Sequence, residues 1–334
     1  RSTSFNNPYW WADNDEFRQH TNRVFGNAYV EYRPKINWSD AYNLVFREQA
    51  GLDVYTTNNT TQAELGSAYN TKGEVENYGV EKNIFNNLFT ANFTAKLGEE
   101  KQWDFGFLLG SEFNHEYRRN WDYDASGLAF YGQPTIGNAS TMNSWSEYKS
   151  QERTVGFFGQ ASLTWSDQLF LTVTGRNDMV STMPRGNRSF FYPSVSLGWN
   201  VTNEAFMDSR PDWFSNLKLR ASWGKNGNER IGQFRYTSLM DGGQNYYFGS
   251  GDNAKMQYGS SPSKIANPNV KWEESEQLDL GFESRFFNNS LTFGFDYFKK
   301  KTNGMLMDQP IPAYVGKGAP IANAGDMQNW GLEF

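Results

Sequence analysis

Few residues in this chain are suited to bond-making chemistry. Histidine occurs only as His20 and His115, and cysteine is absent from the 334 residues. A nucleophilic hydrolase needs a serine or thiol beside a base and a third, orienting group, and no serine stands out as the partner of either histidine. His115 keeps the spacing of Phe113 and Tyr117, which favours a residue of an aromatic surface belt over a catalyst. We expect no enzyme activity.

Acidic residues close in sequence could instead hold a cation. The stretch WDYDASG (121–127) places Asp122 and Asp124 two positions apart, where their oxygens could coordinate Ca²⁺. A calcium loop also needs its turn glycine and terminal glutamate at fixed positions, and this stretch does not supply that pattern. We interpret it as a solvated turn and expect no metal and no cofactor.

Aromatic side chains are the third group that could bind something. They make up 17% of the residues, and several fall in long polar stretches that we expect to be loops. Exposed rings on loops can stack on sugar rings or clamp peptide side chains, whereas the alternatives are packing within the loops or contact with a partner protein. The residues we expect at such a binding surface are Trp121, Tyr123, Tyr131, Tyr246 and Tyr247.

Composition excludes some classes of protein. The formal net charge is −6 and there is no long basic run, which argues against nucleic acid as a partner. No apolar run approaches the ~18–20 residues that a membrane-spanning helix needs. A heavy aromatic load in a polar chain is typical of pleated sheets and of membrane–water interfaces.

The elements that position these side chains are expected to be β-strands, because alternation of apolar and polar residues is the dominant pattern. Leu169, Leu171 and Val173 alternate with Thr172 and Thr174, for example. Similar alternation recurs in the stretches 89–95, 103–112, 154–165, 191–200, 217–223, 277–283 and 291–297. We expect about ten strands of roughly 9–15 residues, near the ~9–11 that a tilted strand needs to cross a bilayer.

The connections between these strands alternate between short and long. Short ones are expected at 34–39, 98–102, 166–168 and 288–289, and long ones at 51–84, 118–152, 226–271 and after 303; 179–189 is intermediate and 202–216 is longer than its class. Aromatic residues gather at both ends of the strands: Trp103, Trp165, Trp199 and Trp213 by the short turns, and Tyr117, Trp121, Phe191, Tyr192, Trp223 and Trp272 by the long loops. Short turns, long loops and two aromatic girdles are typical of a transmembrane antiparallel β-barrel.

The polar face then lines a lumen. The charged residues that we expect there are Arg176, Asp178, Arg220, Glu283 and Arg285, which is a very polar interior for a small packed barrel. The chain ends in WGLEF (330–334), which looks like the opening of another strand. We expect an all-β fragment of a larger barrel.

Several stretches resemble one known family. They are NPYWW (7–11), GNAYVEYRP (26–34), the runs 156–178 and 186–206, and, most specifically, 267–306 and 323–334. The family is that of the SusC/RagA-type TonB-dependent outer-membrane transporters of the Bacteroidetes. One departure is Met179-Val180-Ser181-Thr182-Met183, where the family usually has a Gly-Ser-Ser-Arg-Phe-like run.

The resemblance implies a large plugged barrel of about 22 strands, of which residues 1–334 are the middle part, with the N-terminal plug and the C-terminal end of the barrel outside this sequence. It implies a Gram-negative outer-membrane location and TonB-dependent import of a large glycan or peptide. The implied partners are a SusD-like surface lipoprotein, TonB and outer-membrane lipid. Two alternatives stay open: a structural subunit of a larger outer-membrane assembly, and a barrel enzyme.

Overall fold

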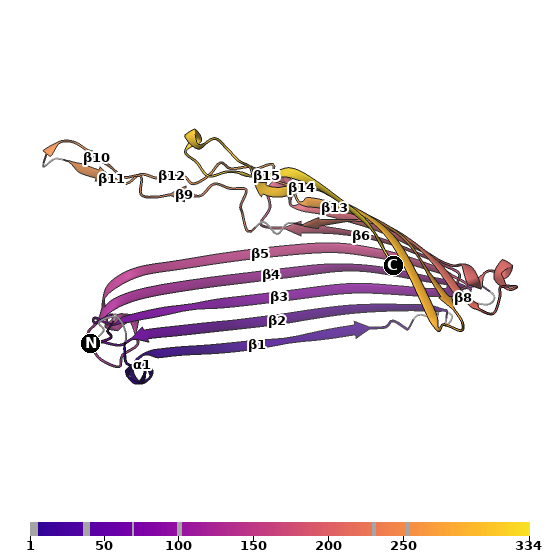
Figure 1. Cartoon of the computed structure of the whole chain (residues 1–334), viewed down its shortest axis with the longest axis horizontal. Helices are drawn as coiled ribbons and strands as arrows, with labels where there is room; N and C mark the ends of the chain where they lie inside the picture. The colour runs from indigo at the N-terminus through magenta and orange to yellow at the C-terminus, as the bar shows by residue number, and fades with distance from the viewer. Residues whose placement is uncertain (1–5, 36–40, 69, 99–101, 229–231, 252–253) are drawn as a thin grey trace. The chain divides into compact units, whose positions relative to one another are not determined.

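The computed structural model describes residues 6–35, 41–68, 70–98, 102–228, 232–251 and 254–334. Nearly all of them lie in strands or in the turns between strands (Figure 1). Eleven strands form one sheet in the order β1-β2-β3-β4-β5-β6-β7-β8-β13-β14-β15. Their bounds are β1 Glu16–Tyr32, β2 Tyr42–Ala63, β3 Glu74–Leu97, β4 Trp103–Leu128, β5 Ala139–Trp165, β6 Leu169–Val180, β7 Ser189–Asn200, β8 Phe214–Asn228, β13 Glu273–Phe286, β14 Leu291–Asp308 and β15 Ile321–Glu333.

The remaining elements are short. The helix α1 (Pro8–Asn14) begins after Asn7, whose side chain accepts a hydrogen bond from the backbone N–H of Tyr9. Two small antiparallel pairs lie between β8 and β13, namely β9 (Met240–Asp241) with β12 (Ser261–Pro262) and β10 (Tyr246–Phe248) with β11 (Lys255–Gln257). Single 3₁₀ turns cover Ile136–Asn138, Arg185–Asn187, Val201–Asn203, Ala205–Met207 and Ala313–Val315. Among the described residues, no helix has both the length and the apolar character to span a bilayer.

The chain divides into two compact units. The first comprises Arg1–Val30, Glu48–Leu88 and Phe113–Arg153, and the second comprises Glu31–Arg47, Phe89–Glu112 and Thr154–Phe334. The first unit has a small core of Val75, Ala125 and Leu128, against which Leu65 and Ile136 pack. The second unit contains β6–β8 and β13–β15 in full.

The strand register of the second unit confirms the predicted two-faced sheet. One row of paired residues that crosses from β5 to β14 is Leu163, Leu171, Leu197, Ala221, Leu280 and Tyr297. The next row is Ser162, Thr172, Ser196, Ser222, Asp279 and Phe298. Because side chains alternate faces along a strand, these rows lie on opposite sides. We call the two sides the apolar face and the polar face. Leu197 on the apolar face is 50% exposed within the protein, as expected of a side chain that meets lipid.

The short turns come where they were expected. Ser166 and Asp167 join β5 to β6 with positive φ angles of 47° and 55°, and three consecutive residues, Phe287, Asn288 and Asn289, have positive φ angles of 53°, 55° and 67° between β13 and β14. The two consecutive left-handed residues of the β5–β6 turn match the twist of a tight antiparallel hairpin, and Asn and Asp, which occur in both turns, tolerate this conformation better than most residues. The expected turns at 34–39 and 98–102 lie partly outside the described residues.

Two of the predicted long loops are wrong. Most of 51–84 belongs to β2 and β3, which have 22 and 24 residues, and most of 118–152 belongs to β4 and β5, which have 26 and 27 residues. The connections themselves are only 64–73 and 129–138. Alternation marks a strand only where its two faces meet different solvents, so it disappears once both faces are in water, although the strand continues.

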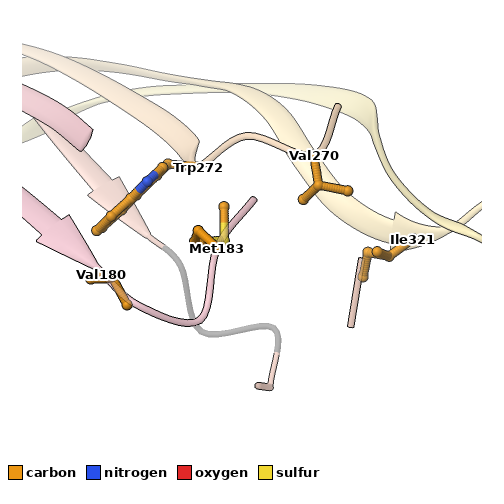
Figure 2. Close-up of a cluster of buried hydrophobic side chains, with 5 residues drawn as sticks. All are labelled: Val180, Met183, Val270, Trp272 and Ile321. Atoms are coloured by element: carbon orange, nitrogen blue, oxygen red, sulfur yellow. The ribbon is translucent and has the colours of Figure 1, made fainter. Parts of the chain in front are cut away.

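A cluster of buried apolar side chains lies at the end of the second unit where the long connections between strands are found. It contains Val180, Met183, Val270, Trp272 and Ile321, which come from β6, the turn after it, the segment before β13 and the start of β15 (Figure 2). The indole N–H of Trp272 donates to the carbonyl of Asn187 at 3.0 Å. The apolar residues in the stretch 179–183, where the sequence departs from the resembled family, therefore include two members of this core.

The cluster corrects the predicted upper belt of aromatic residues. Trp272 is only 6% exposed, and the rings of Tyr192 and Phe190 pack against it with centroid distances of 6.2 and 5.8 Å. Trp272 is thus a core residue against which the partly buried Tyr192 packs, whereas Phe191 is 57% exposed. Sequence position at the end of a strand did not distinguish a belt aromatic from a core aromatic.

The two-faced sheet predicts an asymmetric response to charge. Leu171→Arg or Leu280→Arg in the full-length protein should lower the free energy of unfolding by about 2–4 kcal/mol if the residue sits near mid-bilayer. Thr172→Arg, one residue from Leu171 on the polar face, should have a mild effect. Unfolding by urea in lipid vesicles measures the difference, and equal losses at 171 and 172 would contradict the assignment of faces.

The buried cluster predicts a second asymmetry. Met183→Ala should cost about 2–5 kcal/mol, because it empties a fully buried site. Met179→Ala, four residues earlier and 37% exposed, is the matched control and should cost little. Hydrogen exchange should show the loss of protection at residues 181–188 and 266–272 in the first variant only.

Candidate functional site

The candidate site is the polar face of the second unit. Between β6 and β14 this face is hollowed by a cavity of about 640 Å³. Its charged and polar lining residues include Lys218, Arg220, Gln277, Asp279, Asp296 and Lys300, and two rings, Phe170 and Phe298, share the wall. The Lys218 ammonium lies 5.0 Å from the centre of the Phe170 ring, within the range of a cation–π contact.

One ion pair on this wall crosses an intervening strand. Arg220 on β8 donates to both carboxylate oxygens of Asp296 on β14 at 2.9 Å. Gly281 on β13 is the register partner of both residues, and a Cβ built there would collide with the Asp296 carboxylate. The missing side chain at Gly281 therefore makes room for the two charged side chains to meet above the middle strand.

A second ion-pair network joins β4, β5 and β6. The Arg176 guanidinium donates to Asp178 at 2.9 Å and to Glu112 at 2.8 Å, and it lies 5.5 Å from the centre of the Phe158 ring. Gly156 lies under it, because a Cβ there would collide with Asp178 and would crowd Arg176. Bidentate and stacked geometry of this kind suits arginine and not lysine.

The predicted lumen residues thus form three separate sets. Arg176 pairs with Asp178, Arg220 pairs with Asp296, and Arg285 pairs with Glu283 at 2.7 Å. The partners Glu112, Phe158 and Asp296 were not singled out from the sequence. Alternation assigns a residue to a face, but the partner across two strands depends on register, which a single sequence does not contain.

The predicted binding aromatics do not form one surface. Trp121 and Tyr123 lie within strand β4, not in a loop as predicted. The Trp121 indole N–H donates to the side-chain oxygen of Asn77 at 3.4 Å, and the Arg119 guanidinium lies 5.5 Å from its ring. Tyr131 does lie in a connection, and its hydroxyl donates to the side-chain oxygen of Asn14.

Tyr246 and Tyr247 lie on β10, in the long connection between β8 and β13 (Figure 1). Each is 64% exposed, and Tyr246 packs edge-on against Phe248 with a centroid distance of 4.9 Å. They belong to the second unit, whereas Trp121, Tyr123 and Tyr131 belong to the first. Tyr246 and Tyr247 therefore remain the most accessible pair of the predicted set.

The acidic pair Asp122 and Asp124 lies beside another carboxylate. Burial of Glu76, together with the negative charges of Asp122, Asp124 and Glu74, raises the pKa of Glu76 above its ordinary value. Asp124 also accepts from the Asn143 side-chain N–H group at 3.3 Å. In the part of the chain that the structure describes, no three His, Cys, Asp or Glu side chains are grouped so as to hold a metal ion.

A long antiparallel sheet that has one charged face and an apolar face left exposed is typical of the wall of a transmembrane β-barrel, and the comparisons agree. A family model described as "TonB dependent receptor-like, beta-barrel" matches residues 1–334. TonB-dependent receptor P26 of Formosa agariphila is 29% identical over 326 residues, which cover 96% of this chain and 31% of that protein. TonB-dependent receptor SusC of Bacteroides thetaiotaomicron is 29% identical over 269 residues, which cover 80% of this chain and 26% of SusC.

The fold has a solved counterpart as well. The RagAB peptide transporter superposes with a TM-score of 0.79 at 22% identity, over 97% of this chain and 35% of that one. The chain belongs to the β-barrel family of TonB-dependent receptors, which are outer-membrane proteins and not enzymes. It spans about a quarter to a third of the length of these relatives. The apolar face is accordingly the face that meets lipid.

The strand-crossing ion pair gives a testable prediction. Gly281→Ala should separate Arg220 from Asp296, so that Asp296→Asn lowers stability in the wild-type background and has no further effect in the Gly281→Ala background. The coupling between the two positions should be at most about 1 kcal/mol, because both partners are partly exposed. Gly294→Ala is the matched control, since a Cβ at Gly294 meets nothing within 4 Å. Independent effects at 281 and 296 would contradict the crossing geometry.

Proposed function

We propose that the chain is the middle part of the barrel wall of an importer of the SusC type. In this proposal the complete protein carries an oligosaccharide or a peptide across the outer membrane, with energy delivered through TonB to a plug domain outside this sequence. A SusD-like lipoprotein covers the extracellular side. Membership of the receptor family and the likeness to SusC and RagAB support the proposal.

The observation that carries the proposal is the charge pattern of the polar face. Each of the three arginines predicted to line the lumen, Arg176, Arg220 and Arg285, has a carboxylate oxygen within 3 Å of its guanidinium group. A wall with both signs in matched pairs has no strong field of one sign that would select a highly charged cargo. It offers hydrogen-bonding groups to a large polar molecule in a hydrated lumen, which suits a glycan or a peptide of mixed charge.

The cargo contacts are proposed on the connection between β8 and β13. Tyr246 and Tyr247 each present an exposed ring, one on each face of β10, and rings of this kind stack on sugars or hold apolar peptide side chains. Trp121, Tyr123 and Tyr131 stay predictions of the same kind. Of these, Trp121 and Tyr131 have hydrogen-bond partners within the first unit.

The experiment uses deletion and complementation in the native host. Deletion of the gene should abolish growth on one class of polymer from a panel of glycans and proteins, and a variant with a defective TonB-contacting region should fail to restore it. Normal uptake together with loss of a multiprotein outer-membrane assembly would instead support the structural-subunit alternative.

Replacement of the two tyrosines tests the proposed contact. Tyr246→Ala combined with Tyr247→Ala should raise the half-saturating cargo concentration about tenfold, equivalent to about 1.4 kcal/mol, with an unchanged amount of protein in the outer membrane. Tyr314→Ala is the control, because Tyr314 is 89% exposed in the connection between β14 and β15. Equal effects of the two variants would show that Tyr246 and Tyr247 have no special role.

A further inference from the structure

The apolar face of the second unit contains a groove. Its volume is about 520 Å³, and it crosses β3, β4, β5 and β6. Its walls are large apolar side chains, including Phe93, Phe105, Phe107, Leu163 and Leu171. Two small residues, Ala95 and Ala161, lie among them.

The groove exists because of those small residues. Ala161 is the register partner of Val173, and the next pair on the same face is Leu163 with Leu171. A single methyl group in a row of larger side chains leaves a depression. Ala95 is only 3% exposed, so it forms part of the floor, whereas Phe107 on β4 is 46% exposed and Val173 on β6 is 47% exposed, one on each side of β5, which carries Ala161.

The chemistry of the groove selects a hydrocarbon occupant. Its lining side chains are apolar, because the side chain of Ser162 lies on the polar face, where its hydroxyl donates to the carbonyl of Gly106 at 3.5 Å. A peptide strand or other polar occupant would lose its hydrogen bonds to water there without replacement, which is costly. An alkyl chain has no such bonds to lose.

The groove also lies at a defined level of the bilayer. Trp103 and Trp165, at the short-turn end of β4 and β5, pack with a centroid distance of 5.9 Å, and Trp103 packs on Phe105 at 6.3 Å. At the edge of the groove Tyr42 stacks on Phe93 at 6.2 Å. Tryptophan and tyrosine gather at the headgroup level, and short turns of outer-membrane barrels face the periplasm.

We propose that this groove holds an acyl chain of a phospholipid from the periplasmic leaflet. The groove is continuous with the lipid-facing surface, so the occupant is already present at high local concentration. The inference rests on the outer-membrane location of the family and not on import.

The test uses the full-length protein extracted from outer membranes in mild detergent. Native mass spectrometry should find a retained phospholipid on the wild type that is missing from Ala161→Phe, whose ring fills the groove. Ala221→Phe is the matched control, since Ala221 pairs with Leu197 and Leu280 on the same face. It should keep the phospholipid.

Add-back of dioleoylphosphatidylglycerol to delipidated protein should restore the bound species to wild type and to Ala221→Phe only. Absence of retained phospholipid from the wild type, or equal retention by the wild type and Ala161→Phe, would overturn the proposal. If Ala161→Phe does not form a heat-modifiable barrel, Ala161→Leu fills less of the groove and is compared in the same way. Cargo uptake by Ala161→Phe should be normal, so a failure of this proposal is distinct from a failure of the proposed import.

Discussion

The constraint on which the structure depends is that a backbone in lipid must find all its hydrogen bonds within the protein. Adjacent strands meet this constraint by pairing along their length, as the antiparallel strands from β5 to β15 do, with register shifts between Arg285 and Phe286 and between Thr302 and Leu306. Once the backbone hydrogen bonds are formed in this way, each side chain can point in only two directions, toward lipid or toward the lumen. The alternation of leucine and valine with serine, threonine, aspartate and arginine follows directly from that choice.

The polar face shows how the same geometry handles charge. A flat sheet holds side chains of neighbouring strands only about 5 Å apart, yet Arg220 and Asp296 are separated by a whole strand. A glycine at the crossing point lets the two side chains lie over the backbone of the middle strand. Gly156 has a similar place beneath Arg176 and Asp178. Glycines on this face therefore set which charges can pair, in addition to their usual role in turns.

The sequence was informative wherever the two faces of a strand meet different solvents. The faces of β5–β8, β13 and β14 and the tight turns after Trp165 and Phe286 agree with expectation. The stretch WGLEF lies in a strand as expected, but at the end of β15, which begins at Ile321, and not at its opening. The sequence was uninformative where that contrast ends, so the water-exposed parts of β2–β5 looked like loops. It also could not separate Trp272, which is buried, from Phe191, which is exposed, because burial there depends on a segment more than 80 residues from β6 in sequence.

The same reasoning explains why the strands of the barrel wall do not determine which cargo is bound. Paired charges on the polar face neutralise one another locally, and the residues of the apolar face are constrained only by contact with lipid. Residues that neither pair charges on the polar face nor contact lipid are found in the connections, above all between β8 and β13. There Tyr246, Tyr247 and Tyr258 are exposed. Their sequence is constrained by neither alternation nor register, so it can change without disturbing the barrel. Selectivity can therefore evolve in these connections while the strands keep one pattern.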